Sequence, residues 1–148
     1  VCCKMSTTAR ASAVIPVDVD TVWAKIRAFD SIADLIDPIA SAEMLDGGAP
    51  TEVGACRKLT WKSGETRTQR LLELSDINRR CVWETILAEP ESEVTAAIST
   101  LEATRITEDN STLLTWSAEY SADVTGDFIT FQSKAFAENL KEIRDHLA

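Results

Sequence analysis

Hydrophobic and polar positions alternate along most of the chain, which is the pattern of strands that bury one face. The alternation begins at residues 8–17 and stops at Pro16, which cannot donate to a strand ladder. It returns from residue 40 to residue 120, where turn signals recur about every ten residues. These turns bound six further strands at residues 40–45, 53–62, 65–74, 80–88, 94–106 and 111–121. Because short turns join antiparallel neighbours, the pattern predicts an antiparallel sheet of about seven strands.

Apolar residues three or four positions apart predict helices at three places. Asp18 is a suitable N-cap for a helix that runs to Phe29, and a second short helix stops before Pro38. The longest apolar stripe begins near Thr125 and predicts a C-terminal helix of some twenty residues, about 30 Å long. Its inward positions are Phe128, Phe131, Ala135, Phe136, Leu140, Ile143 and Leu147. An antiparallel sheet beside one long helix buries its inner face against that helix, so the fold class is α+β.

The composition is that of an ordinary globular chain. Its 148 residues are 45% hydrophobic and 26% charged, which argues against disorder. We expect a flexible N-terminal segment at residues 1–7 and one domain at residues 8–148. No stretch approaches the ~20 apolar residues of a membrane span. The formal net charge of −9 disfavours nucleic acid as a partner, because phosphate binding depends on Lys and Arg.

Histidine and cysteine usage narrows the chemistry. The one histidine, His146, lies near the C-terminus, where the negative end of a helix dipole is enough to explain it, so His-based catalysis is disfavoured. The four cysteines, Cys2, Cys3, Cys56 and Cys81, include no C-x-x-C pair. We therefore expect free thiols, no metal and no cofactor. Free thiols indicate an intracellular, reducing compartment, either the cytoplasm or an organelle such as a plastid.

Tryptophans are candidates for the wall of an internal cavity. Trp61, Trp83 and Trp116 lie on three different predicted strands, and Trp23 lies on the first predicted helix. Core packing explains Trp23. For the three strand tryptophans a ligand wall and a dense core are equally good explanations, because a buried indole N–H needs a partner in either case.

Asn139 and Arg57 are polar residues where the pattern expects apolar ones. Asn139 shares the inward stripe of the C-terminal helix, and a buried amide costs on the order of 1–3 kcal/mol unless a sheet group or a ligand pairs with it. Arg57 shares one strand face with Leu59 and Trp61 by the period of two. An inward arginine either pairs with a carboxylate or serves an anionic or carbonyl oxygen of a ligand.

The order of the elements resembles the START-like superfamily, also called the Bet v 1-like or SRPBCC group, which includes polyketide cyclases and lipid transport proteins. The resemblance extends over residues 11–147. Its matching pieces are residues 15–18 with 22–23, 53–57, 70–74 with 79–80, and 114–116. It implies a helix-grip fold, in which a seven-stranded antiparallel sheet wraps around a long C-terminal helix and two short helices follow the first strand. It also implies a cavity between sheet and helix for an apolar or amphipathic small molecule.

The resemblance further implies which residues line that cavity. It places Gln69 and Leu71 on the inner face, whereas counting apolar positions alone places alternate residues such as Leu72 and Leu74 there. A shift of one residue separates the two registers, and we follow the resemblance. The candidate ligand-binding residues are Arg57, Leu59, Trp61, Gln69, Leu71, Trp83, Ala97, Trp116, Phe131, Ala135 and Asn139.

Two departures from the family pattern bear on function. Plant hormone receptors and the tear-factor synthase of onion carry glutamate where this chain has Gln69, and an amide cannot take up a proton. The turn at residues 62–65 is too short to be the gate loop of the hormone receptors. Proton-transfer catalysis and a hormone-receptor role are therefore both disfavoured.

Three functions remain as hypotheses. The leading one is non-catalytic binding or transport of a hydrophobic small molecule of lipid, polyketide or isoprenoid type. The second is a cyclase, isomerase or lyase in which Arg57 is catalytic and polarises a carbonyl. The third is a protein partner held by an acidic surface, although a solvated outer face is the simpler explanation of these carboxylates. The carboxylates are Glu84, Glu89, Glu91, Glu93, Glu102, Glu108 and Asp109.

Overall fold

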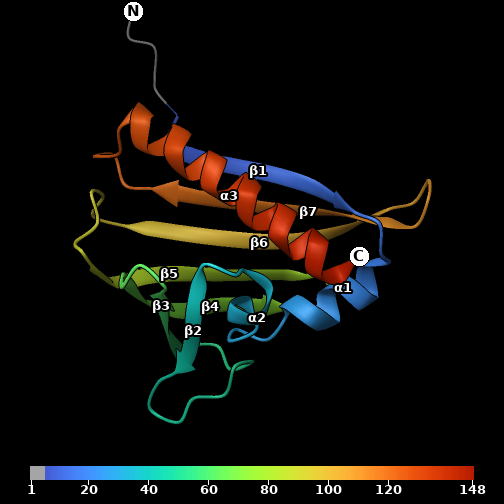
Figure 1. Cartoon of the computed structure of the whole chain (residues 1–148), viewed down its shortest axis with the longest axis horizontal. Coiled ribbons are helices and arrows are strands. Elements are labelled where there is room, and N and C mark those ends of the chain that lie inside the picture. The colour runs from blue at the N-terminus through green and yellow to red at the C-terminus, as the bar shows by residue number, and fades with distance from the viewer. Residues whose placement is uncertain (1–5) are drawn as a thin grey trace, which may run out of the picture.

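A seven-stranded antiparallel sheet and a long helix form the two layers of the structure (Figure 1). The computed structural model describes residues 6–148, so most of the expected flexible segment at residues 1–7 lies outside the described residues, as do Cys2 and Cys3. The elements are β1 (Thr8–Ile15), α1 (Val19–Ile26), α2 (Ile32–Leu35), β2 (Ile39–Met44), β3 (Cys56–Trp61), β4 (Thr66–Ser75), β5 (Arg80–Glu89), β6 (Ala97–Ile106), β7 (Ser111–Tyr120) and α3 (Gly126–Leu147). The sheet order is β1-β7-β6-β5-β4-β3-β2. The predicted helix-grip fold is confirmed.

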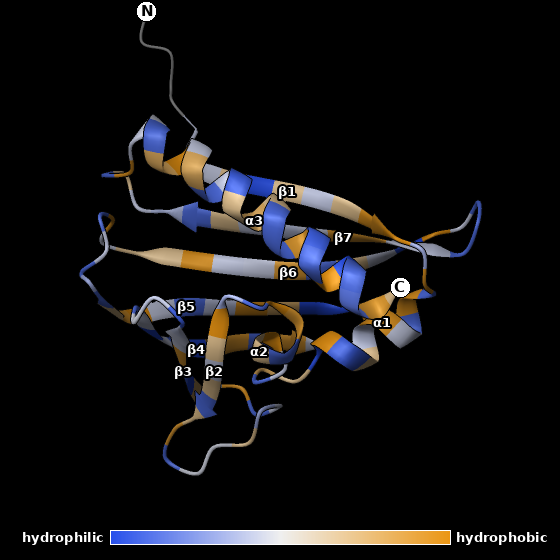
Figure 2. Ribbon diagram, in the orientation of Figure 1, coloured by the Kyte–Doolittle hydropathy of each residue, from blue (hydrophilic) through white to orange (hydrophobic). Residues whose placement is uncertain are grey.

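Helix α3 buries one side against the sheet. The hydroxyl of its N-cap, Thr125, accepts a hydrogen bond from the Phe128 backbone N–H at 3.2 Å, as expected for a helix that begins there. Phe136, Leu140 and Ile143 are its buried residues. Figure 2 shows apolar residues on the side of α3 toward the sheet and polar residues on the outward side.

Small residues on β1 let α3 approach the sheet closely. Ala9 is fully buried, and Ala11 and Ala13 pack partly buried against the core. In Figure 1, α3 crosses above β1, β7 and β6. Near its C-terminal end, His146 Nε2 lies 3.0 Å from Asp37, just after α2. The helix therefore covers one half of the sheet, and the inner faces of the strands in the other half lie beyond its width.

The register of β4 follows the family resemblance. Gln69 and Leu71 are buried, while Arg70 and Leu72 are exposed. The register obtained by counting apolar positions was therefore wrong at Arg70 and Leu72. The physical reason is a bulge at Leu72, which has no partner in the pairing of β4 with β5 and interrupts the period of two. Beyond the bulge Leu74 packs against the core, as Leu71 does before it.

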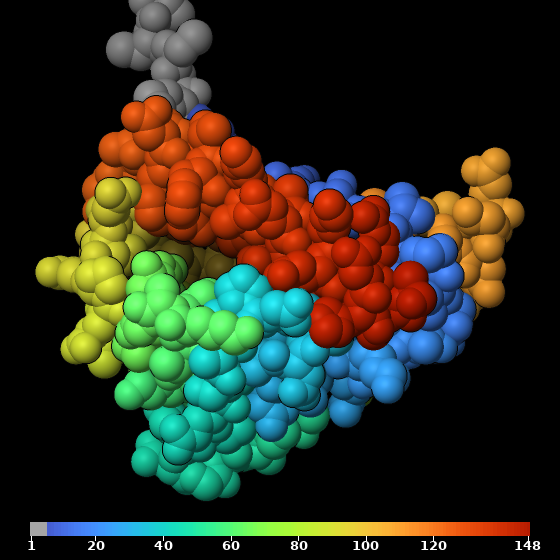
Figure 3. Space-filling model, viewed as in Figure 1, coloured from blue at the N-terminus to red at the C-terminus, as the bar shows by residue number. Residues whose placement is uncertain are grey.

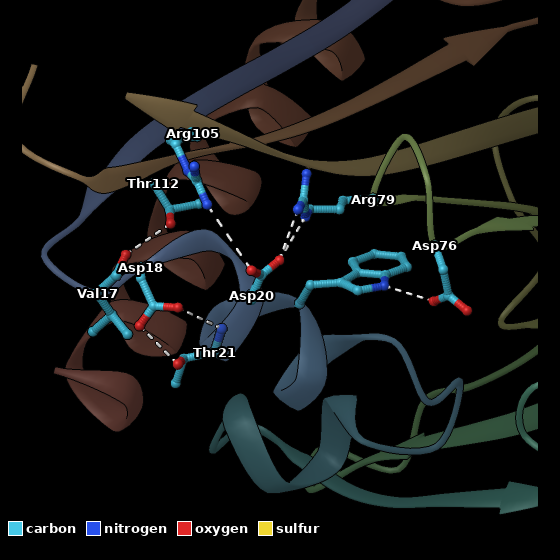
Figure 4. A network of polar contacts seen from close by, with 9 residues as sticks. Val17, Asp18, Asp20, Thr21, Asp76, Arg79, Arg105 and Thr112 are labelled. Atoms are coloured by element: carbon cyan, nitrogen blue, oxygen red, sulfur yellow. Dashed lines mark hydrogen bonds and ion pairs between the residues drawn. The ribbon is translucent and has the colours of Figure 1, made fainter. Parts of the chain in front are cut away.

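Polar contacts fix the entry of the chain into α1 (Figure 4). The Val17 carbonyl accepts a hydrogen bond from the buried Thr112 hydroxyl at 2.7 Å, and Asp18 caps the helix by accepting from the Thr21 N–H at 3.1 Å. Asp20 pairs with Arg79 at 2.7 Å. The first helix therefore begins where the sequence predicted.

Three predicted boundaries were wrong, two of them because other groups take the backbone hydrogen bonds. Helix α1 ends at Ile26 rather than Phe29, whose N–H donates to the Pro50 carbonyl at 2.9 Å. Strand β6 begins at residue 97 rather than 94, since the N–H of Thr95 donates to the Asp123 carboxylate at 3.0 Å. Strand β3 begins at residue 56 rather than 53, after Gly54, whose φ of +94° suits glycine.

The acidic residues on the outer face of the sheet are partly paired. Glu84 lies 3.5 Å from Arg70, and Glu102 lies 3.6 Å from Arg80. Glu89, Glu91 and Glu93 are exposed at the connection between β5 and β6.

Within residues 6–148, no helix has both the length and the apolar composition that crossing a membrane requires.

Two residues of α3 provide a test of this packing. Leu140 is fully buried, whereas Phe131 has 68% of its surface exposed. We expect Leu140→Ala to lower the free energy of unfolding by about 2–5 kcal/mol, because the deletion leaves a cavity against the sheet. Phe131→Ala should change it by no more than about 0.5 kcal/mol. Urea unfolding followed by circular dichroism measures both changes, and equal losses would contradict the packing of α3.

Candidate functional site

A cavity opens between the inner face of the sheet and the N-terminal half of α3. Its volume is about 260 Å³, which is small beside the ~300–1,000 Å³ of most small-molecule sites. Figure 3 shows the hollow between the orange part of α3 and the yellow and green segments that contain the β5–β6 and β3–β4 connections. The cavity is thus enclosed by the sheet on one side and reachable from solvent on the other.

The structure brings together nearly all of the predicted site residues. Leu71 is fully buried but does not line the cavity. The candidates that do line it are Arg57, Leu59, Trp61, Gln69, Trp83, Ala97, Trp116, Phe131, Ala135 and Asn139. Their roles in binding stay predictions.

Aromatic rings make up much of the cavity wall and of the core behind it. Trp83 lies edge-on to Trp116 with ring centres 5.7 Å apart, and Trp116 stacks on Phe136 at 5.3 Å. Phe29 completes the row, with its ring centre 6.3 Å from that of Trp83. Trp23, by contrast, donates its indole N–H to Asp76 at 2.7 Å, in agreement with a structural role. The two buried strand tryptophans, Trp83 and Trp116, are therefore core and cavity wall at once.

Arg57 extends from β3 into the buried interior, where 3% of its surface is exposed. Its Nε donates to Gln69 Oε1 at 2.9 Å, and its Nη1 donates to the Phe29 carbonyl at 2.6 Å. The guanidinium lies 3.8 Å from the centre of the Phe29 ring and 5.0 Å from that of Trp83. Neutral acceptors and aromatic faces hold this cation in place.

Two buried donors on residues that line the cavity have no hydrogen-bond partner among residues 6–148. They are Nη2 of Arg57 and Nε1 of Trp116. Buried polar atoms are almost always paired, because an unpaired one costs about 1–3 kcal/mol. A pair of such donors on residues that line one cavity indicates a missing acceptor.

Burial also sets the protonation of the groups around Arg57. It lowers the pKa of Arg57 to about 9, while the nearby Cys81 thiol and Asp30 carboxylate act in the opposite direction. It raises the pKa of Cys81 to about 11, against the effect of Arg57. At neutral pH the site therefore holds a charged guanidinium beside a neutral thiol.

One predicted inward residue of α3, Phe131, lies at the rim of the cavity instead. Phe131 was expected on a buried stripe of α3, yet it is 68% exposed. The reason is that this side chain lies at the opening of the cavity, where it lines the hollow and does not pack into the core. Trp61 is half-buried at the rim, with the Arg67 guanidinium 5.5 Å from its ring centre. Asn139 is half-buried, and its side chain makes no hydrogen bond to the rest of the described chain.

Sequence reasoning missed several lining residues. Ser99 follows Ala97 by two positions and Tyr120 follows Trp116 by four, so the period of two could have found both. Burial raises the pKa of Tyr120 to about 12, so its hydroxyl is neutral. Thr85 also lines the cavity, and it follows Trp83 by two positions, so the same period could have found it.

Groups suited to proton transfer lie outside the cavity interior. Glu65 is the one Asp or Glu among the lining residues, and it is exposed in the β3–β4 turn. His146 lies at the C-terminal end of α3, where its Nε2 is 3.0 Å from Asp37. Across residues 6–148 no three His, Cys, Asp or Glu side chains gather as a metal site would need.

Comparison with known proteins gives a family and a set of similar structures. A family model described as "Polyketide cyclase / dehydrase and lipid transport" matches residues 6–148. The protein XoxI from Bacillus cereus is similar with a TM-score of 0.82 and 25% identity, over 97% of this chain and 96% of that one. A protein from Nitrosospira multiformis has a TM-score of 0.81 at 22% identity, over 95% and 96% of the two chains. A search of curated proteins finds no match.

A plant protein shares the fold at low identity. Ginseng major latex-like protein 151 from Panax ginseng aligns with a TM-score of 0.77 at 11% identity, over 95% of this chain and 97% of that one. At this level of identity the likeness concerns the fold alone.

The setting of Arg57 predicts an unusual response to mutation. Arg57→Met keeps the length of the side chain and removes a buried charge that no carboxylate balances. We expect the free energy of unfolding to rise or to fall by no more than about 1 kcal/mol, because a well-packed apolar residue often replaces a buried charge without loss. Leu59→Ala, on the same strand face and also buried, should lose about 2–5 kcal/mol. Urea unfolding compares the two, and a loss of similar size in both would show that Arg57 serves stability.

Proposed function

Because the chain belongs to the polyketide cyclase/dehydrase and lipid transport family, we propose that it binds a small amphipathic molecule in the cavity between the sheet and α3, as a carrier or binding protein. The observation that carries this proposal is the pair of buried donors on Arg57 and Trp116 that lack partners among the described residues. A ligand with an apolar body and an acceptor oxygen meets both needs of the site. Its body covers the aromatic wall and its oxygen accepts from the free N–H groups.

The cavity volume limits the size of the ligand. A volume of 260 Å³ equals the room of about nine water molecules at ~30 Å³ each. This supports a single-ring compound or a short isoprenoid, and it does not favour a two-chain lipid.

The neutral partner of Arg57 supports binding without catalysis. General acid–base chemistry needs a group that gains and loses a proton, and the amide of Gln69 does neither. The acids that could serve, Glu65 and His146, lie at the exposed turn and at the far end of α3. A carrier needs none of these groups.

A second candidate rests on the same free donor. Nη2 of Arg57 is an N–H in a dry, aromatic setting, which is the kind of group that stabilises a developing oxyanion. A cyclase or isomerase that polarises a carbonyl through Arg57 would use it. Mass spectrometry of a bound carbonyl compound distinguishes the two functions, because an enzyme changes the compound and a carrier returns it unchanged.

Filling the cavity from α3 tests the proposed function. Ala135 is half-buried and lines the cavity, whereas Ala137, two residues along, is exposed. We expect 4-phenylbutyrate to bind the full chain at one site, and Ala135→Phe to weaken that binding at least about 10-fold, because the new ring takes the space of the ligand. Native mass spectrometry gives the stoichiometry and tryptophan fluorescence gives the affinity.

Ala137→Phe is the matched control, because it adds the same ring to the exposed side of the same helix. Its affinity for 4-phenylbutyrate should equal that of the parent chain. The absence of binding to the parent chain, or an equal affinity in all three proteins, would refute a ligand site in this cavity.

A further inference from the structure

Among the arginines of the described chain, Arg57 is the one that is buried, and it forms no ion pair. Ion pairs among the described residues include arginines 27, 70, 79, 80, 105 and 144, all of them at least partly exposed. Arg57 is buried and takes part in none of these pairs. A charge inside a protein is ordinarily paired. The Asp30 carboxylate acts on Arg57 without forming an ion pair with it, so no carboxylate of the described chain lies within ion-pair distance of this guanidinium.

Gln69 occupies the position from which a carboxylate could form an ion pair with Arg57. It lies directly opposite Arg57 in the β3–β4 pairing, and its Oε1 accepts from Arg57 Nε at 2.9 Å. A glutamate here would place a carboxylate oxygen on the same N–H and neutralise the guanidinium. The second acceptor, the Phe29 carbonyl, is also neutral. Both protein partners of Arg57 therefore orient its guanidinium and leave its charge unbalanced.

We propose that the cavity selects an anionic ligand, a carboxylate in the simplest case, and that Gln69 determines this preference by leaving the charge of Arg57 for the ligand. The proposal rests on the proposed function and adds the charge of the ligand and a specificity-determining residue. The carboxylate accepts from Nη2 of Arg57, and Nε1 of Trp116 is a second free donor at the same cavity. A neutral ligand can accept the same hydrogen bonds, but it leaves the cation without a counter-charge.

Two probe compounds of nearly the same shape and different charge test the preference of the cavity for an anionic ligand. We expect 4-phenylbutyrate to bind the full chain at least about 10-fold more tightly than its neutral amide, 4-phenylbutanamide, in calorimetric titrations at pH 7. Both compounds have the same ring, chain length and acceptor oxygen. A difference in affinity therefore reports the charge.

Substitution of Gln69 tests its role in specificity. Gln69→Glu places a carboxylate on Arg57, so the affinity for 4-phenylbutyrate should fall at least about 10-fold while that for the amide stays within about 3-fold of the parent value. Asn78→Asp is the control, because it makes the same amide-to-acid change in the exposed β4–β5 turn and should alter neither affinity. Thermal unfolding of both variants shows whether they fold.

Each outcome decides between the two proposals. Equal affinity for the acid and the amide in the parent chain would overturn the anionic preference and leave cavity binding intact. An acid preference that survives Gln69→Glu in a folded protein would overturn the role of Gln69. Failure of both probes to bind the parent chain would overturn the proposed function as well.

Discussion

A single helix has to cover the inner face of a sheet that is wider than the helix. Seven strands span about 29 Å at ~4.8 Å per spacing, whereas a helix with its side chains is about 10 Å across. Helix α3 packs on β1 and β7, where alanines let it approach, while α1 and α2 close one end of the sheet. The inner faces of β3 to β6 form the wall of the cavity together with Trp116 and Tyr120 of β7. The cavity is thus a consequence of how the two layers fit.

Different residues serve stability and recognition within this arrangement. Buried apolar side chains such as Leu140 and Leu59 hold the helix and the sheet together. Arg57 is costly to bury: burial lowers its pKa, and no carboxylate of the described chain forms an ion pair with it. Gln69 and the Phe29 carbonyl fix the orientation of its guanidinium, but both are neutral and do not neutralise its charge. A group that is costly to bury and carefully oriented is typical of a binding site.

The seven strands and helix α3 could be predicted because period two, period 3.6 and the Thr125 cap are local signals. The pairing of β1 with β7 joins the two ends of the sheet's sequence and has no such local signal. The phase of β4 could not be predicted, since a bulge at Leu72 interrupts its alternation. Phe131 was misplaced because helical spacing shows which side of α3 it is on, and the extent of the sheet beneath that side is a tertiary property. That Arg57 points inward was readable from its strand. That no carboxylate of the described chain pairs with Arg57 depends on how β3, β4 and the segment after α1 pack together.

The indole N–H signals of the four tryptophans give the most direct test of a ligand held by the buried donors. In a nitrogen–proton correlation NMR spectrum, addition of 4-phenylbutyrate should shift the Trp116 signal, because its unpaired N–H gains an acceptor. The Trp23 signal should stay in place, since that N–H already donates to Asp76. A Trp116 signal that does not move at saturating ligand, or shifts confined to the outer face of the sheet, would contradict a ligand in this cavity.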